Sequence, residues 1–364
     1  MTQFESILRS KIIIAVLPAV MILLLASCAS NPARQKTNQN YVLYPSPPDT
    51  ARIQFLTSIT SSDNTTTHKS GFSRFVLGDD ETKSIKKPYG VFIRNGKIYV
   101  CDSGLGGLEI IDLNKKTFDY FLPEGKGQLK LPLNCFVDDD GKLYVADGEK
   151  LQVIIFDPEG NYLGSFGEPE KFKPTDVSVY DNKIWVANLN NHSINVYQKD
   201  TYQLLYKFPE TETGQENYLY QPTNLFITGD KVFVSDMGDF KIKIFTHEGQ
   251  YVKSIGSQGT NVGQFVRPKG IAVDRESNLF AVDAGFENVQ VFNYEGKLLL
   301  YFGGPYKGPG DLWLPAKVAI DYENVAFFRK YVDPEYQLKY LILVTSQYGP
   351  DKLNIYGAIE PSKK

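Results

Sequence analysis

KPYGVFI, at residues 87–93, is the first of six related segments that decide the fold. The other five are LPLNCFV at 131–137, KPTDVSV at 173–179, QPTNLFI at 221–227, RPKGIAV at 267–273 and LPAKVAI at 314–320. In each segment a proline precedes a short, β-rich apolar run, and successive prolines are 42 to 48 residues apart. A repeat of this period indicates an architecture built from similar supersecondary units.

Two further positions repeat in step with the first five prolines. An Asp or Asn closes a second apolar run 14 or 15 residues after the proline, at Asp102, Asp147, Asn188, Asp236 and Asp283. Nine residues later a large apolar residue ends a third run, at Ile111, Phe156, Tyr197, Phe245 and Phe292. Turn-forming pairs such as Asn95-Gly96 separate the runs. Four short antiparallel strands per repeat are typical of a propeller blade, so we expect an all-β, six-bladed β-propeller over residues 51–360.

The sixth repeat departs from this pattern because it supplies only three strands before the chain ends. The segment RIQFLTSI at residues 52–59 has the composition of the missing strand. We predict that it completes the last blade, so that the ring has no free edge from which to open. The same repeat contains an aromatic-rich insertion at residues 327–340, which is either a partner-docking hairpin or a lengthened strand pair.

The segment Asn188-Leu189-Asn190-Asn191-His192, followed by an apolar strand, carries a family resemblance. It is similar to the corresponding part of NHL repeats, and weaker copies begin at Asp236 and Asp283. The resemblance implies the propeller fold. It assigns no activity, because propellers of this kind include receptors, scaffolds, lyases and lactonases.

The first thirty residues have the layout of an export signal. Arg9 and Lys11 precede an apolar run that ends in Leu25-Ala26-Ser27-Cys28. This ending resembles the lipobox of bacterial lipoproteins, which implies removal of residues 1–27 and acylation of Cys28. Residues 28–50 are polar and contain proline, so we expect a flexible tether. The resemblance places the protein in the bacterial cell envelope, and Ala29 after the cysteine favours the outer membrane; an uncleaved signal anchor is the alternative.

Composition limits the partners of the chain. The formal net charge is −3, so there is no basic field of the kind that holds nucleic acid. After Cys28 only Cys101 and Cys135 remain, both in strand-like apolar runs. We expect them to be small buried hydrophobes, although a disulfide between them is an open alternative.

Candidate site residues come from the loops at one mouth of the central channel. The segments that enter the inner strands, which include Tyr89 and Lys269, share that face with the loops between second and third strands, so we expect an acidic, amide-rich funnel there. The recurring Asp and Asn residues are interpreted as turn-stabilising groups. Residues that break the repeat symmetry or stand near the mouth are the candidates for ligand binding: Asn134, Asp176, Asn224, Lys317, Asn190 and His192.

Metal chemistry is limited by the small number of histidines. His68, His192 and His247 are too few and too scattered for the His-rich zinc centre of metal-dependent lyases with a related fold. A calcium ion held by Asn134, Asp176 and Asn224, as in lactonase-like propellers, remains an alternative.

Two functional hypotheses follow. The first is a monomeric, membrane-tethered binding or scaffold propeller that needs no cofactor and binds an envelope protein, a peptide or a glycan. The second is an envelope hydrolase or lyase with a calcium ion in its channel. The absence of a recognisable catalytic motif favours binding over catalysis.

Overall fold

The computed structural model describes residues 41–65, 81–168 and 170–362. The predicted signal at residues 1–27, the predicted lipidation site Cys28 and His68 lie outside these residues. Within them, no helix is long and apolar enough to cross a membrane.

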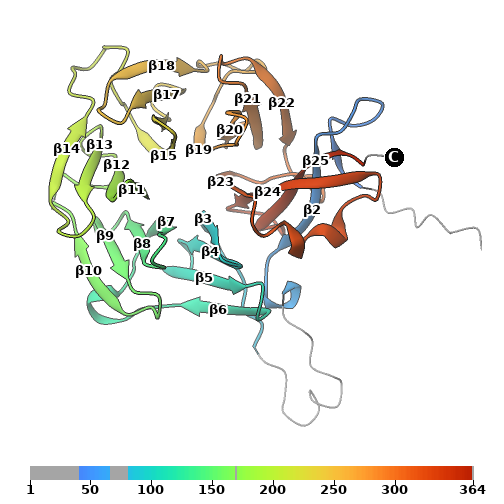
Figure 1. The fold of residues 1–364 in the computed structure, drawn as a ribbon, viewed down its shortest axis with the longest axis horizontal. Coiled ribbons are helices and arrows are strands. Elements are labelled where there is room, and N and C mark those ends of the chain that lie inside the picture. Colours follow the sequence, from blue (N-terminus) through green and yellow to red (C-terminus); the bar gives the residue numbers. More distant parts are fainter. Residues whose placement is uncertain (1–40, 66–80, 169, 363–364) are drawn as a thin grey trace, which may run out of the picture. The chain divides into compact units, whose positions relative to one another are not determined.

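The described strands form five four-stranded sheets and one five-stranded sheet, each antiparallel. Figure 1 shows these sheets as blades around a central axis, which confirms the predicted six-bladed β-propeller. The strand nearest the axis in each blade begins at one of the six predicted prolines: β3 (Pro88–Arg94), β7 (Pro132–Val137), β11 (Pro174–Tyr180), β15 (Pro222–Thr228), β19 (Pro268–Val273) and β23 (Pro315–Asp321).

The other strands follow outward in chain order. Blades 1 to 3 contain β4 (Lys97–Asp102), β5 (Gly107–Asp112), β6 (Thr117–Phe121), β8 (Leu143–Asp147), β9 (Gln152–Phe156), β10 (Tyr162–Phe166), β12 (Lys183–Asn188), β13 (Ser193–Gln198) and β14 (Leu204–Phe208). Blades 4 and 5 contain β16 (Lys231–Asp236), β17 (Lys241–Thr246), β18 (Tyr251–Ile255), β20 (Leu279–Asp283), β21 (Asn288–Phe292) and β22 (Leu298–Gly303).

The recurring Asp and Asn residues hold the start of each inner strand. Pro88 lies directly opposite Asp102 in the β3–β4 pair, and the equivalent pairing recurs in the next four blades. The Asp102 carboxylate accepts hydrogen bonds from the backbone N–H groups of Lys86, Lys87, Gly104 and Leu105. Asp147 and Asp283 accept four such bonds each. Their predicted turn-stabilising role is therefore confirmed.

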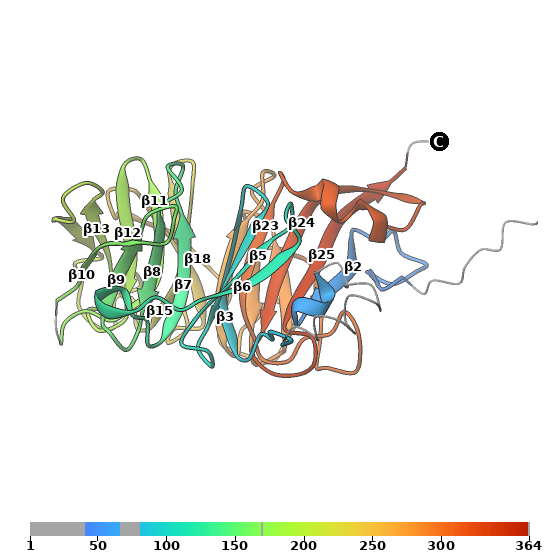
Figure 2. The same cartoon turned by 90° about the horizontal axis from the view of Figure 1, so that it is seen from below.

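The N-terminal strand closes the ring as predicted. Blade 6 consists of β23, β24 (Tyr336–Ser346), β25 (Leu353–Pro361), β2 (Ile53–Ile59) and β1 (Leu43–Tyr44). β2 pairs with β25, and both views show the two strands side by side (Figures 1 and 2). Leu43 and Tyr44 pair with β2, and the Tyr44 hydroxyl donates to the Gly310 carbonyl over 2.7 Å. These two residues therefore belong to the ring rather than to the flexible tether expected over 28–50.

The insertion of blade 6 folds back on the blade. It forms the 3₁₀ turns η3 (Val325–Phe327) and η4 (Arg329–Tyr331), and then enters the 11-residue strand β24. Phe328 is buried in the apolar cluster that also contains Ile59 of β2 and Ile355 of β25. This packing favours the lengthened strand pair over the projecting hairpin.

The core lies between neighbouring blades. Buried side chains of one blade pack on those of the next, as Trp185 of β12 does in one cluster with Val232 of β16. Cys101 and Cys135 share the cluster between blades 1 and 2, and both thiols are free and buried. The disulfide alternative is therefore wrong, and the prediction of small buried hydrophobes is confirmed.

Candidate functional site

A cavity of about 620 Å³ occupies the central channel. It extends from Asp176 and Lys317, near the start of the inner strands, to the turns after these strands, which include Asp139 and Asp181. We call the end where the inner strands begin the proline face, and the end where they turn into the second strands the turn face. The residues at the mouth of the cavity belong to the turn face, so this cavity does not open at the proline face, where the funnel was expected.

An ion pair forms the floor of the cavity. The Lys317 ammonium lies 2.6 Å from Asp176 Oδ2, and both side chains are largely buried. Lys317 is in blade 6 and Asp176 in blade 3, and in a ring of six blades these lie opposite each other. The pair therefore crosses the channel and closes it toward the proline face.

The inner strands carry a β-bulge at this level, since the pairing register shifts directly after the proline in all six. A bulge redirects the side chains next to it. Asp176 and Lys317 stand two residues after the proline of their inner strand. In blades 1 and 5 this position is occupied by Gly90 and Gly270. A Cβ at Gly90 would lie 2.5 Å from the Leu133 carbonyl oxygen, and one at Gly270 would lie 2.5 Å from Lys317 Cα. Only glycine allows neighbouring inner strands to approach this closely.

Asn134 and Asn224 link the floor to the neighbouring blades. Asn224 Nδ2 donates to Asp176 Oδ2 over 3.2 Å, and Asn134 Nδ2 donates to the Thr175 carbonyl over 2.7 Å. Both asparagines are buried, and each Oδ1 lacks a hydrogen-bond partner among the described residues. The sequence analysis expected both asparagines at an open channel mouth, whereas the structure places them beside Asp176 at the floor, and neither asparagine lines the cavity.

The remaining two candidates lie elsewhere. Asn190 and His192 are exposed in the loop between β12 and β13, on the proline face. Asn190 Nδ2 donates to the Glu170 carbonyl over 3.2 Å, and His192 Nδ1 lies 2.9 Å from the Tyr220 carbonyl oxygen. The structure does not bring them together with Asp176 and Lys317.

The middle of the cavity, which we call the waist, is lined mainly by apolar side chains. The position four residues after the proline is Phe92 in blade 1, Phe136 in blade 2 and Phe226 in blade 4, whereas blades 3 and 6 have Ser178 and Ala319. The rings of Phe92 and Phe136 are 4.7 Å apart, and valine and isoleucine side chains fill the wall between the blades. Sequence reasoning missed these residues, although an aromatic residue at the same register in three repeats is a signal that was available.

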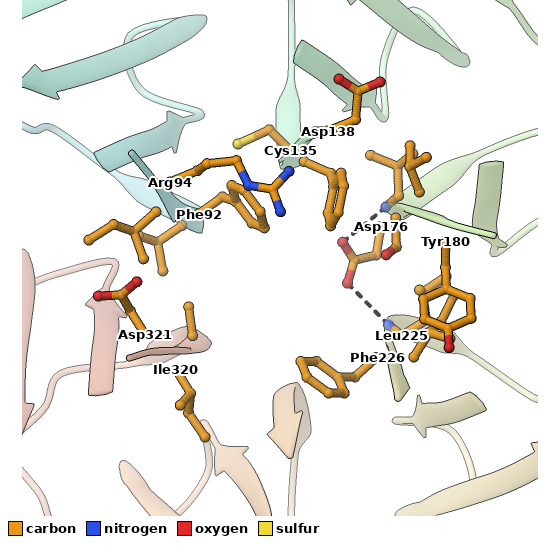
Figure 3. Close-up of a pocket in the computed structure, with 18 of the residues that line it drawn as sticks. Phe92, Arg94, Cys135, Asp138, Asp176, Tyr180, Leu225, Phe226, Ile320 and Asp321 are labelled. Carbon is orange, nitrogen blue, oxygen red and sulfur yellow. Dashed lines mark hydrogen bonds between the residues drawn. The ribbon is translucent and has the colours of Figure 1, made fainter. Parts of the chain in front are cut away.

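Arg94 projects over this waist (Figure 3). Its guanidinium lies 6.0 Å from the ring centre of Phe92 and 5.9 Å from that of Phe136. Nη1 is 2.9 Å from Asp139 Oδ1 but makes no well-oriented hydrogen bond among the described residues. Because the Asp139 side chain is 96% exposed, this ion pair is weak.

Charged groups line the mouth at the turn face. Lys199 Nζ lies 2.8 Å from Asp138 and 3.0 Å from Asp140. Arg275 lies over the ring of Tyr322 at 4.0 Å. Among the described residues that line the cavity, Arg94 and Arg275 are thus the cations without a well-oriented carboxylate partner, and Arg94 is the one that lies over the aromatic waist.

The floor does not resemble a calcium site. Calcium in proteins is surrounded by six to eight oxygen ligands. Here the Lys317 ammonium pairs with Asp176 Oδ2 and neutralises its charge. Within the described residues, no group of three or more His, Cys, Asp or Glu side chains is arranged to hold a metal ion.

Comparisons with known proteins agree with this architecture. The family model DUF5128, described as a 6-bladed beta-propeller, matches residues 186–360. No curated protein matches the sequence.

Several solved structures are similar in fold. A structural genomics protein of unknown function from Bacteroides thetaiotaomicron aligns with a TM-score of 0.57 at 14% identity, over 85% of this chain and 76% of its own. A streptogramin B lyase aligns with a TM-score of 0.51 at 14% identity, over 77% and 84% of the two chains. The virginiamycin B lyase from Staphylococcus aureus, with quinupristin, has a TM-score of 0.51 at 14% identity, over 75% and 95%. At such identities the likeness shows the fold alone.

Proposed function

We propose that this chain is a lipid-anchored binding propeller of the bacterial cell envelope, and that its central cavity takes the carboxyl-terminal end of a peptide from an envelope partner. The observation that carries the proposal is the combination of an apolar waist with the weakly held guanidinium of Arg94. The envelope location rests on the lipobox resemblance at Cys28.

The size of the cavity suits such a ligand. At about 620 Å³ it falls within the roughly 300–1,000 Å³ of small-ligand sites, and it accommodates one or two residues of a peptide. An apolar side chain would pack on Phe92, Phe136 and Phe226, and the terminal carboxylate would pair with Arg94. A glycan fits this waist less well, because sugars need many hydrogen-bonding partners where the wall offers aliphatic groups.

The ion pair at the floor argues against the hydrolase or lyase hypothesis. Asp176 is the one carboxylate among the six residues that stand two positions after the prolines, and Lys317 already compensates its charge. A calcium-dependent reaction would need this carboxylate as a ligand.

The cavity proposal is tested by narrowing the waist. The probe is N-acetyl-Leu-Phe with a free carboxylate, and binding to the full-length protein in a neutral detergent is measured by calorimetry. The variant combines Ser178→Phe with Ala319→Phe, which the ring can accept because three other blades carry Phe at this position. We expect the affinity to fall about tenfold or more. The two added phenyl rings would fill the space in which an apolar side chain of the peptide packs, and burial of such a side chain stabilises the complex by roughly 1.5–3 kcal/mol.

The control is Ala326→Phe, which adds a phenyl group to an exposed residue of η3 outside the cavity. It should bind the peptide as the wild type does. The role of Arg94 is examined with Arg94→Met, which should weaken the free acid but not its C-terminal amide. Equal binding by the narrowed and wild-type proteins, or no binding by the wild type, would overturn the proposal.

A further inference from the structure

The proline face carries basic side chains that have no acidic partner. Lys87 and Arg267 directly precede Pro88 and Pro268, and Lys269 directly follows Pro268. In the described part of the chain, none of the three forms an ion pair. The contacts of the two lysine ammonium groups are with aromatic rings: Lys87 lies 5.5 Å from the ring centre of Tyr348, and Lys269 lies 4.8 Å from that of Tyr89.

Lys269 is unusual because it is also buried. The residue is only 4% exposed to solvent. Another buried lysine in the ring has acidic partners. The Lys243 ammonium is fully buried and lies 3.0 Å from Asp236 and 2.7 Å from Asp239. Lys269 has no such carboxylate partner among the described residues, so its charge is left for another anion to balance.

The nearby carboxylates are committed to other partners. Asp102 and Asp283 accept backbone hydrogen bonds at the starts of β3 and β19. Asp176 pairs with Lys317. Burial, followed by the charges of Arg267 and Lys87, lowers the pKa of Lys269 to about 8. The charges that face Lys269 therefore repel it.

We propose that the proline face binds an oxyanion of the phosphate class between Lys269, Arg267 and Lys87. A phosphate group carries enough charge to balance several cations and accepts hydrogen bonds from lysine and arginine together. None of these three residues lines the cavity, so the proposal does not depend on the proposed peptide ligand. The phosphate can come from solution or from a lipid headgroup, and both sources present the same chemistry.

The test uses sulfate, because it mimics phosphate but does not titrate near neutral pH. Calorimetry on the full-length protein in a neutral detergent at pH 8 is performed in two buffers of different ionisation enthalpy. Because the pKa of Lys269 is lowered to about 8, part of the Lys269 population is neutral at this pH, so anion binding should take up protons. In Lys269→Met the affinity should fall about tenfold or more, and the proton uptake should disappear.

The matched control is Lys297→Met, an exposed lysine of the same blade in the turn before β22. It should bind sulfate with the same affinity and proton uptake as the wild type. Misfolding should not confuse the result, because Lys269→Met keeps the unbranched apolar stem of the side chain and removes only the ammonium group. Unchanged sulfate binding in Lys269→Met, or no binding by the wild type, would overturn the proposal.

The source of the phosphate is distinguished with two further ligands, inorganic phosphate and monomeric dihexanoylphosphatidic acid. If the wild type binds the lipid more tightly than inorganic phosphate, and Lys269→Met loses this binding, the site is assigned to a lipid headgroup. If the wild type binds the two ligands with equal affinity, the site is assigned to the free anion. Binding of both ligands that survives Lys269→Met contradicts the site.

Discussion

Buried carboxylates in this ring differ in how their charge is compensated. Asp102 accepts four backbone N–H groups, and Asp176 pairs with Lys317. Glu109 in β5 has neither kind of partner: it is fully buried, and neither carboxylate oxygen has a hydrogen-bond donor among the described residues. Burial, followed by the negative charge of Asp102, raises the pKa of Glu109 to about 10. The folded protein therefore holds a proton on this residue.

This proton makes stability depend on pH. The unfolded chain releases it near the ordinary glutamate pKa of about 4.3, whereas the folded protein keeps it until about pH 10. The free energy of unfolding should therefore fall as pH rises between these values, by at most about 1.4 kcal/mol per pH unit. Glu109→Gln keeps the neutral, similarly shaped side chain and should flatten this dependence.

Urea unfolding at pH 5, 7 and 9 measures the effect. The variant should gain stability relative to the wild type as pH increases. Glu295→Gln, at an exposed position, is the control and should leave the pH profile unchanged. A constant difference between Glu109→Gln and the wild type across the three pH values would show that Glu109 is not protonated in the folded protein.

At the scale of elements, the closing strand β2 is tied to the insertion by one side chain. Gln54 is fully buried, its Nε2 donates to the Tyr331 carbonyl over 2.8 Å, and its Oε1 accepts from the Asp333 N–H over 3.0 Å. The Gln54 side chain thus forms hydrogen bonds with two backbone groups of the insertion that would otherwise be buried without a partner. This explains how an insertion with 3₁₀ turns is held against a regular sheet.

Gln54→Ala should destabilise the ring by about 1–3 kcal/mol, because it leaves these backbone groups without partners. The urea midpoint of the full-length protein measures the loss. Gln337→Ala, in the exposed part of β24, should change the midpoint little. If both variants behave alike, the hydrogen bonds of Gln54 do not secure the insertion.

At the scale of the whole molecule, the two proposed sites lie at opposite ends of one axis. The floor formed by Asp176 and Lys317 separates the cavity at the turn face from the basic cluster at the proline face. A peptide and an oxyanion can therefore bind without competing for the same space.

The proposed membrane attachment concerns the whole molecule as well. Cys28→Ser should abolish incorporation of an alkyne-tagged fatty acid and move the protein from the membrane to the soluble fraction, because several buried acyl chains are needed for durable anchoring. Labelling of cells followed by fractionation measures both effects. Ser30→Ala should remain labelled and membrane-bound; a labelled Cys28→Ser protein would contradict the proposed lipidation.

The sequence by itself determined the architecture, the number of blades and the strand that closes the ring. The reason is that these features depend on local, repeated signals. A proline begins each inner strand, and an Asp or Asn opposite five of them satisfies the preceding backbone. Residues 52–59 stood out because the sixth repeat lacked a strand.

Only the tertiary structure decided which end of the channel is open. Asp176 and Lys317 are 141 residues apart, and nothing local in either repeat shows that their side chains meet across the axis. Their contact depends on the bulges of opposite inner strands and on the close approach that Gly90 and Gly270 allow. For the same reason the unpaired charge of Lys269 became visible only when the positions of all nearby carboxylates were known, since compensation of charge is a property of distances in space.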